Sequence, residues 1–269
     1  MPNTFDFTTH TSTQTAVDFL ADKTGLPKAR IKDAMNKGAC WWTLKGKQVR
    51  LRRATKVMPQ GTRIQLYYDE QVLARQPEGG KLILDMGRYS IWYKPHGMLA
   101  QGSQWGDHCS LLRWVELECK RECFLVHRLD ADAAGLMIIA HDSKAAALLS
   151  QLFQTRDLKK YYLARVAGEI NAKALQIDQA LDGKESVSIV NTIKINDDRL
   201  STLVEVLIET GRKHQIRRHL SGISHAIIGD RLYGNPGKIP LQLLAYKLEF
   251  RCPITKQLIQ LELPNDLHL

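Results

Sequence analysis

The sequence predicts an α+β protein with a small N-terminal domain and a larger C-terminal one. Short strand-like segments are mixed with a few helices, without the regular strand–helix alternation of a doubly wound parallel sheet. The 269 residues exceed a typical single domain, and 44% of them are hydrophobic, enough for a proper core. Pro77 and Gly79-Gly80 break any regular element between the two parts. We therefore place the domains at residues 1–72 and 82–269, with a linker at 73–81.

The first part of the chain predicts two helices followed by extended segments. Ser12 or Thr13 can cap a first helix that ends at Gly25. A second helix begins at Pro27, which is favoured at helix starts, and ends at Gly38. The extended segments are residues 41–44, 48–51 and 63–68, with a turn at Lys45-Gly46.

The charge of this first part is one-sided. The net charge of +10 indicates a polyanionic partner, with nucleic acid as the default and an anionic membrane surface as the alternative. No Asp or Glu occurs in residues 34–68, whereas ordinary surfaces intersperse both signs. The cations of this stretch are Lys37, Lys45, Lys47, Arg50, Arg52, Arg53, Lys56 and Arg63. A merely solvated charged face is the other interpretation.

Two short helices followed by a basic hairpin resemble the alpha-L RNA-binding motif, over about residues 13–70. The hairpin turn departs from the usual Asn-Gly, because Lys45-Gly46 stands there. The RNA-binding residues that we name in this domain are Lys45, Lys47, Arg50, Arg52 and Arg53.

The larger domain predicts strands around a few helices. A strand at residues 90–93 is followed by a turn at 94–97, and residues 136–140 form an apolar run. Ser143 can cap a helix whose apolar residues, down to Phe153, share one face. Residues 201–209 alternate as a half-buried strand does, and a helix follows through His219.

Asp130 is the first candidate for chemistry. It follows His127 and Arg128 at the edge of an apolar run, where an acid beside cations can stay ionised and act as a nucleophile. A loop salt bridge is the plainer interpretation. Two further segments, residues 159–166 and 210–219, favour the nucleophile over the salt bridge. In this order and spacing the three segments resemble the signature segments of RNA pseudouridine synthases of the RluA type, over about residues 82–262.

The resemblance implies a pseudouridine synthase fold, with a mixed and mainly antiparallel sheet, and three catalytic residues. Asp130 would be the essential acid, and Arg217, directly after Gln-Ile, would pair with it through a fork that Lys cannot reproduce. Tyr162 would be the platform for the base and the proton acceptor. A phosphate contact for Arg217 and a core position for Tyr162 are the alternatives.

RNA contacts are also expected in the larger domain. The resemblance implies that Arg128 enters the gap left by a flipped-out base, and we add Lys160 and Arg212 as RNA-binding residues. Asp230 lies in a segment expected only to form a turn that packs the site, and His127 and His214 are left out of the catalytic set.

The chain departs from the family after the acid. The family has Thr-Ser or Thr-Thr where Ala133-Ala134 stand, so two hydroxyls are absent, and Asp132 adds a negative charge. Substrate choice and the rigidity of the turn are the properties that this departure affects.

The function expected is isomerisation of uridine to pseudouridine on a flipped-out nucleotide, in ribosomal RNA rather than transfer RNA because a separate module suits a large structured RNA. Isomerisation needs no donor, so we expect no cofactor. Among His108, Cys109, Cys119 and Cys123 no common zinc spacing occurs. The alternatives are a catalytically silent RNA-binding protein on the same scaffold and a metal-dependent nuclease.

We expect RNA as the partner, a monomer, and a cytoplasmic location. No apolar run is long enough to span a bilayer, and no signal peptide is visible at the N-terminus. Five cysteines are an odd number, which favours reduced thiols.

Overall fold

The chain forms two compact units in a computed structural model that describes residues 2–10, 13–44 and 46–269. The first unit contains Met1–Pro77 and also Gln101–Trp114; the second contains Glu78–Ala100 and Val115–Leu269. The polypeptide therefore passes from one unit to the other three times. No feature of the sequence indicated the return of residues 101–114 to the first unit.

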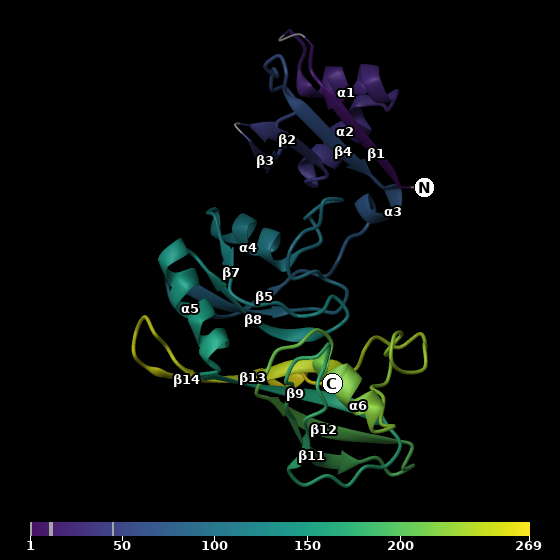
Figure 1. The fold of residues 1–269 in the computed structure, drawn as a ribbon, viewed down its shortest axis with the longest axis vertical. Coiled ribbons are helices and arrows are strands. Elements are labelled where there is room, and N and C mark those ends of the chain that lie inside the picture. The colour runs from purple at the N-terminus through teal and green to yellow at the C-terminus, as the bar shows by residue number, and fades with distance from the viewer. Residues whose placement is uncertain (1, 11–12, 45) are drawn as a thin grey trace. The chain divides into compact units, whose positions relative to one another are not determined.

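The first unit is built on a four-stranded antiparallel sheet in the order β1-β4-β2-β3 (Figure 1). Its elements are β1 (Asn3–Thr8), α1 (Ala16–Thr24), α2 (Lys28–Asn36), β2 (Cys40–Leu44), β3 (Lys47–Arg50), β4 (Arg63–Tyr68) and α3 (Glu70–Leu73). The two expected helices and the three expected strands are confirmed. Strand β1 was missed, because its polar residues alternate on the edge of the sheet with Phe5 and Phe7 only partly buried.

The cap of α1 differs from the prediction. Thr15 caps the helix, its Oγ1 accepting from the Asp18 amide at 3.3 Å. Thr13 lies before this position, and Ser12 lies outside the described residues. The helix ends as expected at Gly25, whose φ of 71° is the left-handed conformation that glycine adopts without strain.

The core of the first unit lies between its two longer helices and the sheet. Buried Leu20 and Ile31 from the helices belong to the same apolar cluster as Leu66 from β4. Trp42 and Tyr68 are also buried in this cluster, at 7% and 6% exposure, so both are core residues and not base-stacking surfaces.

The second unit is built on a mixed sheet in the order β10-β11-β12-β9-β13-β8-β6-β5, with β14 beside β13 and β7 beside β8. Strand β13 pairs in parallel with β8, and the other pairings are antiparallel. The strands are β5 (Lys81–Asp85), β6 (Tyr89–Lys94), β7 (Phe124–Leu125), β8 (Ala134–Ala140), β9 (Leu158–Ala167), β10 (Leu175–Ile177), β11 (Ser188–Ile195), β12 (Ser201–Ile208), β13 (Leu243–Arg251) and β14 (Leu258–Glu262). This mixed, mainly antiparallel sheet confirms the α+β prediction.

Helices flank this sheet. They are α4 (Leu111–Cys119), which begins in the segment that returns to the first unit, α5 (Ser143–Thr155), α6 (Gln215–Gly222) and the short 3₁₀ helix η1 (Asn265–Leu267). Helix α5 packs on β8 and β7, and α6 on β11 (Figure 1). The cap of α5 is Asp142, which accepts from the Ala145 amide at 2.8 Å, and not Ser143 as expected. The carboxylate is the stronger acceptor for a helix N-terminus.

Gly135 shows how closely the strands approach next to Asp130. Its φ is 127°, and a Cβ there would lie 2.3 Å from the Ala245 carbonyl oxygen of the parallel neighbour β13. Only glycine fits this position, and its lack of a side chain lets β8 begin in close contact with β13, directly after the turn that contains Asp130.

Across residues 2–10, 13–44 and 46–269, no helix combines the length and the apolar character needed to cross a membrane.

Candidate active site

Asp130 lies in the connection between β7 and β8, where its side chain is 31% exposed. The preceding Leu129 is buried and anchors the turn in the core. The Ala133 amide donates to the Asp130 carbonyl at 3.2 Å, and the Gly97 amide donates to the Ala131 carbonyl at 2.9 Å. Backbone bonds thus fix the acid at the edge of the sheet and leave its carboxylate partly open to solvent.

A buried lysine, Lys94 at the end of β6, holds the same turn. Its Nζ donates to the carbonyls of Ala133, Met98, Pro95 and Ala131 at 2.5, 2.8, 3.0 and 3.3 Å. Burial lowers its pKa to about 7, against the opposing effect of nearby carboxylates. Four carbonyl acceptors favour the charged ammonium. We expected only a turn here; a lysine closing a largely apolar strand was the signal that could have revealed it.

The absent hydroxyls leave no gap in the turn. Ala133 and Ala134 are 2% and 0% exposed, so both are part of the packed interior. The charge of Asp132 is paired with Arg231, whose Nη2 lies 2.9 Å from its Oδ1. The turn is therefore held by Lys94 and backbone bonds, and its extra acid faces a cation.

Arg217, on α6, is the largest of the fully buried side chains, at 2% exposure. Its Nε and Nη2 each donate at 2.7 Å to the carboxylate of Asp230. Its Nη1 lies 3.5 Å from Asp130 Oδ2. The structure thus brings Arg217 to Asp130 as expected, but its fork engages a different acid.

Asp230 has a larger role than the turn residue that we expected. It is 1% exposed, and it also accepts from the amides of Leu232 and Tyr233 at 2.9 and 3.0 Å. Although burial alone would raise the pKa of Asp230, the bonds from Arg217 and the two amides hold it below the usual value. The short, charge-assisted bonds of Arg217 go to Asp230 because this acid is fully enclosed and needs them. Asp130 is partly solvated, and its contact with Arg217 Nη1 is the longer one, at 3.5 Å.

Tyr162 lies on β9 between Val206 of β12 and Ala245 of β13, and it is 8% exposed. Burial and the negative charge of Asp130 raise its pKa. The phenol is therefore protonated at neutral pH, which suits a platform that can donate a hydrogen bond. The adjacent Tyr161 has different surroundings: its hydroxyl donates to Glu249 at 3.3 Å. This alternation agrees with the expected opposite orientation of the two tyrosines.

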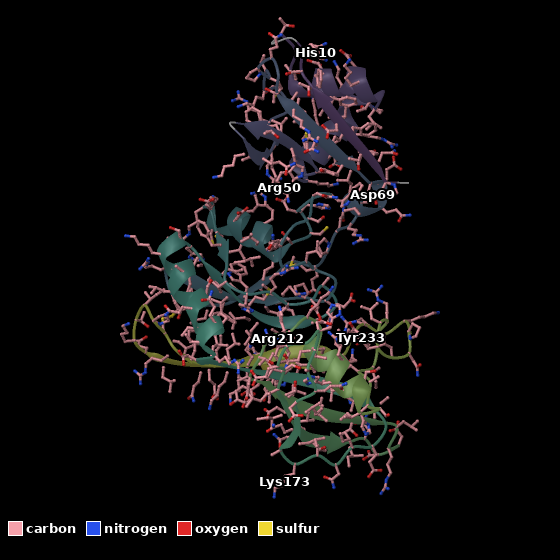
Figure 2. All side chains as sticks on the ribbon, viewed as in Figure 1. His10, Arg50, Asp69, Lys173, Arg212 and Tyr233 are labelled. Atoms are coloured by element: carbon pink, nitrogen blue, oxygen red, sulfur yellow. The ribbon has the colours of Figure 1, made fainter. Side chains whose placement is uncertain are left out.

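The expected RNA-binding cations of this unit occupy different environments. Arg128 is exposed, directly beside the catalytic turn. Lys160 lies 5.8 Å from the Phe153 ring, and burial lowers its pKa to about 8. Arg212, at the turn before α6 and labelled in Figure 2, donates from Nε to the Glu185 carbonyl at 2.8 Å. Arg128 is the most accessible of the three.

His127 is a structural residue. Its Nε2 accepts from the Ile138 amide at 2.9 Å, and its ring stacks on Phe153 with the centroids 4.5 Å apart. Burial lowers its pKa to about 3, so the ring is neutral. Its position outside the catalytic set is consistent with this packing.

The basic stretch of the first unit divides into paired and unpaired cations. Lys37 pairs with Asp33, Arg63 pairs with Asp6, and Arg50 and Arg52 pair with Asp107. Lys47 and Arg53 are exposed and have no ion pair within the described part of the chain. Lys45 lies outside the described residues. Two cations that we expected to bind RNA, Arg50 and Arg52, are thus offset by an acid of their own unit.

Asp107 belongs to the segment that returns to the first unit, and it lies between two arginines. Arg50 Nε is 3.0 Å from Asp107 Oδ2, to which Arg52 also donates. Arg50 further donates to the Ser103 carbonyl at 2.9 Å, and its guanidinium lies 4.1 Å from the Trp41 ring centroid. Arg50, labelled in Figure 2, is therefore a structural residue of this unit.

A metal centre needs several ligating side chains close to one point. Among residues 2–10, 13–44 and 46–269, no group of three or more His, Cys, Asp or Glu side chains is placed to hold a metal ion.

The second unit thus places one partly exposed aspartate beside a buried arginine on a mixed sheet, a combination that points to a class of enzyme. Comparison with known proteins identifies the class. The family model described as RNA pseudouridylate synthase matches residues 88–222. The chain belongs to this family, and the protein is an RNA pseudouridine synthase, an isomerase.

Relatives of known name agree with this assignment. The chain is 31% identical over 198 residues to the dual-specificity RNA pseudouridine synthase RluA of Vibrio parahaemolyticus, covering 65% of this chain and 79% of that protein. It is 34% identical over 211 residues to the uncharacterized RNA pseudouridine synthase YhcT of Bacillus subtilis, covering 70% of each.

Solved structures agree in fold. Human RNA Pseudouridylate Synthase Domain Containing 1 superposes with a TM-score of 0.61 at 18% identity, covering 71% of this chain and 86% of that one. Human RNA Pseudouridylate Synthase Domain Containing 4 superposes with a TM-score of 0.56 at 24% identity, covering 69% and 89%.

Proposed function

We propose that Asp130 is the nucleophile of the isomerisation, that Arg217 orients it, and that the ring of Tyr162 supports the flipped-out base. The observation that supports this most is the unequal sharing of Arg217. Asp230 takes both short bonds of the guanidinium, so Asp130 keeps oxygen lone pairs free while the same cation lies 3.5 Å from its Oδ2. A carboxylate held by a full fork would be a poorer nucleophile.

The reaction breaks the glycosidic bond between uracil and ribose, rotates the base and joins the two through a ring carbon. Substrate and product have the same atoms, so the balance needs only a proton to leave that carbon and another to return to the ring nitrogen. Asp130 would hold the reactive fragment while the base turns, and Tyr162 would limit the directions in which the base can move. Arg128, exposed beside the turn, would fill the gap in the RNA.

We further propose that the RNA substrate is ribosomal and that residues 1–72 serve as an RNA-binding domain, joined by a linker at 73–81 to a catalytic domain at 82–269. Exposed Lys47 and Arg53 support this, because both are free to neutralise phosphates. The protein would act as a monomer in the cytoplasm. The name of the Vibrio relative, a dual-specificity enzyme, is a reason to test transfer RNA alongside ribosomal RNA.

The test is to map pseudouridines in ribosomal and transfer RNA from cells with and without the gene, and from cells that carry Asp130→Asn or Asp132→Asn. Asp130→Asn keeps the shape of the side chain and removes its charge, so the sites should disappear while RNA affinity stays nearly unchanged. Asp132→Asn is the matched control, since this acid lies two positions away and pairs with Arg231 on the surface. Sites that persist with Asp130→Asn would contradict the role of Asp130, and sites confined to transfer RNA would contradict the substrate.

A further inference from the structure

His214 lies between Asp130 and Tyr233. Its Nε2 is 3.7 Å from Asp130 Oδ1, and its Nδ1 is 2.9 Å from the Tyr233 hydroxyl. The two rings meet edge to face with their centroids 5.6 Å apart, and the side chain of His214 is 16% exposed. Tyr233, labelled in Figure 2, belongs to the loop that also contains Asp230.

The hydrogen bond to Tyr233 decides which nitrogen of His214 carries the proton. Burial lowers the pKa of His214, against the raising effect of Asp130, so the ring is neutral at neutral pH. A neutral imidazole has one N–H and one lone pair. If Tyr233 donates to Nδ1, the N–H is on Nε2 and points toward the carboxylate of Asp130. The other tautomer would direct a lone pair at the negative charge, which is unfavourable.

The two oxygens of Asp130 then face two different donors. Oδ2 faces Arg217 Nη1 at 3.5 Å, and Oδ1 faces His214 Nε2 at 3.7 Å. Both distances exceed an ordinary hydrogen bond, so the carboxylate is oriented from two sides without being saturated. Catalytic hydrogen bonds are often long before substrate binds and shorten in the complex.

The backbone of His214 is consistent with a fixed side-chain direction. It adopts φ 54° and ψ 28°, the left-handed region, directly before α6. Its side chain makes no capping bond to the helix, although this is the capping position. Non-glycine residues in this region persist only where their surroundings hold them, often at functional sites.

We infer that His214 is a positioning residue for Asp130, with Tyr233 selecting the tautomer that donates toward the acid; this inference rests on the proposed role of Asp130. The loop after α6 therefore contributes two residues with separate roles in the site. Asp230 occupies the strong bonds of Arg217, and Tyr233 sets the proton of His214.

The test uses four variants of the full-length protein: His214→Asn, Tyr233→Phe, the double variant, and His225→Asn as control. Asparagine tolerates the left-handed backbone but is too short to reach Asp130. His225 is a matched histidine whose Nδ1 lies 3.0 Å from the Ala167 carbonyl oxygen. The measurements are the single-turnover rate of pseudouridine formation and the RNA dissociation constant.

His214→Asn should slow the single-turnover step about 10- to 100-fold through misplacement of the nucleophile, with RNA affinity unchanged within about twofold. Tyr233→Phe should slow it about fivefold, the contribution of one hydrogen bond. The double variant should be no slower than His214→Asn, because the hydroxyl acts only through the histidine.

Three outcomes would overturn the inference. The first is a rate for His214→Asn equal to that of His225→Asn, the second is a change in RNA affinity alone, and the third is multiplication of the two single effects. Tyr233→Phe keeps the test decisive if His214→Asn does not fold. Asp130→Asn measured alongside separates the two proposals: if it remains active, the proposed function fails, whereas if it is inactive and His214→Asn is normal, only this inference fails.

Discussion

Each unit contains a cluster in which one charged side chain interacts with two of opposite charge, and the shared group has the opposite sign in the two units. In the first unit one acid, Asp107, serves two arginines, Arg50 and Arg52. In the second unit one arginine, Arg217, serves two acids, Asp130 and Asp230. The side chain of Asp107 in the first unit is only 11% exposed, whereas that of Asp130 in the second unit is 31% exposed. Sharing one arginine between two acids therefore leaves one acid open to solvent, and sharing one acid between two arginines does not.

The same substitution made in both clusters should show this difference most strongly. Arg217→Lys should lower the single-turnover rate by about 100-fold or more, because an ammonium cannot hold Asp230 with two bonds and still reach Asp130. Arg52→Lys should change the rate little and the free energy of unfolding by less than about 1 kcal/mol, since Arg50 still holds Asp107 and Arg52 is 27% exposed. The measurements are single-turnover kinetics and urea unfolding. Normal activity of Arg217→Lys would contradict the role of the guanidinium in orienting Asp130.

Asp107→Asn should break the cluster of the first unit. Two partly buried arginines would lose their shared carboxylate, which should lower the free energy of unfolding by about 1–3 kcal/mol. Activity per folded molecule on a short RNA should be retained, because the proposed catalytic residues belong to the other unit. Urea unfolding followed by tryptophan fluorescence would measure the loss. A stability equal to that of the wild type would show that Asp107 is dispensable for this unit.

The unpaired cations of the first unit should carry its share of RNA affinity. Lys47→Ala with Arg53→Ala should reduce the slope of log affinity against log salt by about 1.8 on duplex and about 1.4 on single-stranded RNA, if each contacts one phosphate. Arg50→Ala should change stability more than the slope, because its guanidinium is engaged with Asp107 and Trp41. Binding isotherms at several salt concentrations would test this. An unchanged slope for the double variant would leave this face without a role in RNA binding.

The smallest effect concerns one half-buried histidine in each unit, His108 and His127. Burial lowers both pKa values, that of His127 to about 3. The unfolded chain therefore binds more protons below pH about 6.5, so the stability from keeping these rings neutral is complete above that pH and is lost as pH falls toward the folded pKa. Urea midpoints between pH 7.5 and pH 4 should fall less steeply for His127→Gln than for the wild type. Equal slopes would assign the acid sensitivity to other groups.

The sequence was informative where chemistry demands particular residues in a particular order. The three segments around Asp130, Tyr162 and Arg217 predicted the family, and the structure places Asp130 within reach of Arg217. Alternation and turn residues predicted the helices α1, α2, α5 and α6 and the strands β2, β3, β4, β6 and β12, because local side-chain direction follows from the backbone period. The remaining strands were not predicted.

What could not be predicted depends on pairings between distant segments. Asp230 and Arg217 lie close in sequence, but nothing local indicates that Asp230 takes the fork and Asp130 the remaining donor. Lys94 looked like part of a turn because the four carbonyls that it binds come together only in the folded sheet. Asp107 lies far beyond the basic stretch, so a count of acids within residues 34–68 overestimated the free positive charge.

The return of residues 101–114 to the first unit has a consequence for how the chain is made. Synthesis proceeds from the N-terminus, so the strands and helices of the first unit emerge well before Asp107 does. Until then the Asp107 carboxylate that binds both Arg50 and Arg52 is absent, and so is the Gln104 carbonyl, which accepts from Trp41 Nε1 at 3.0 Å. The first unit can therefore be completed only after β5 and β6, two strands of the second unit, have been synthesised. Folding of the first unit to completion thus depends on synthesis of part of the second.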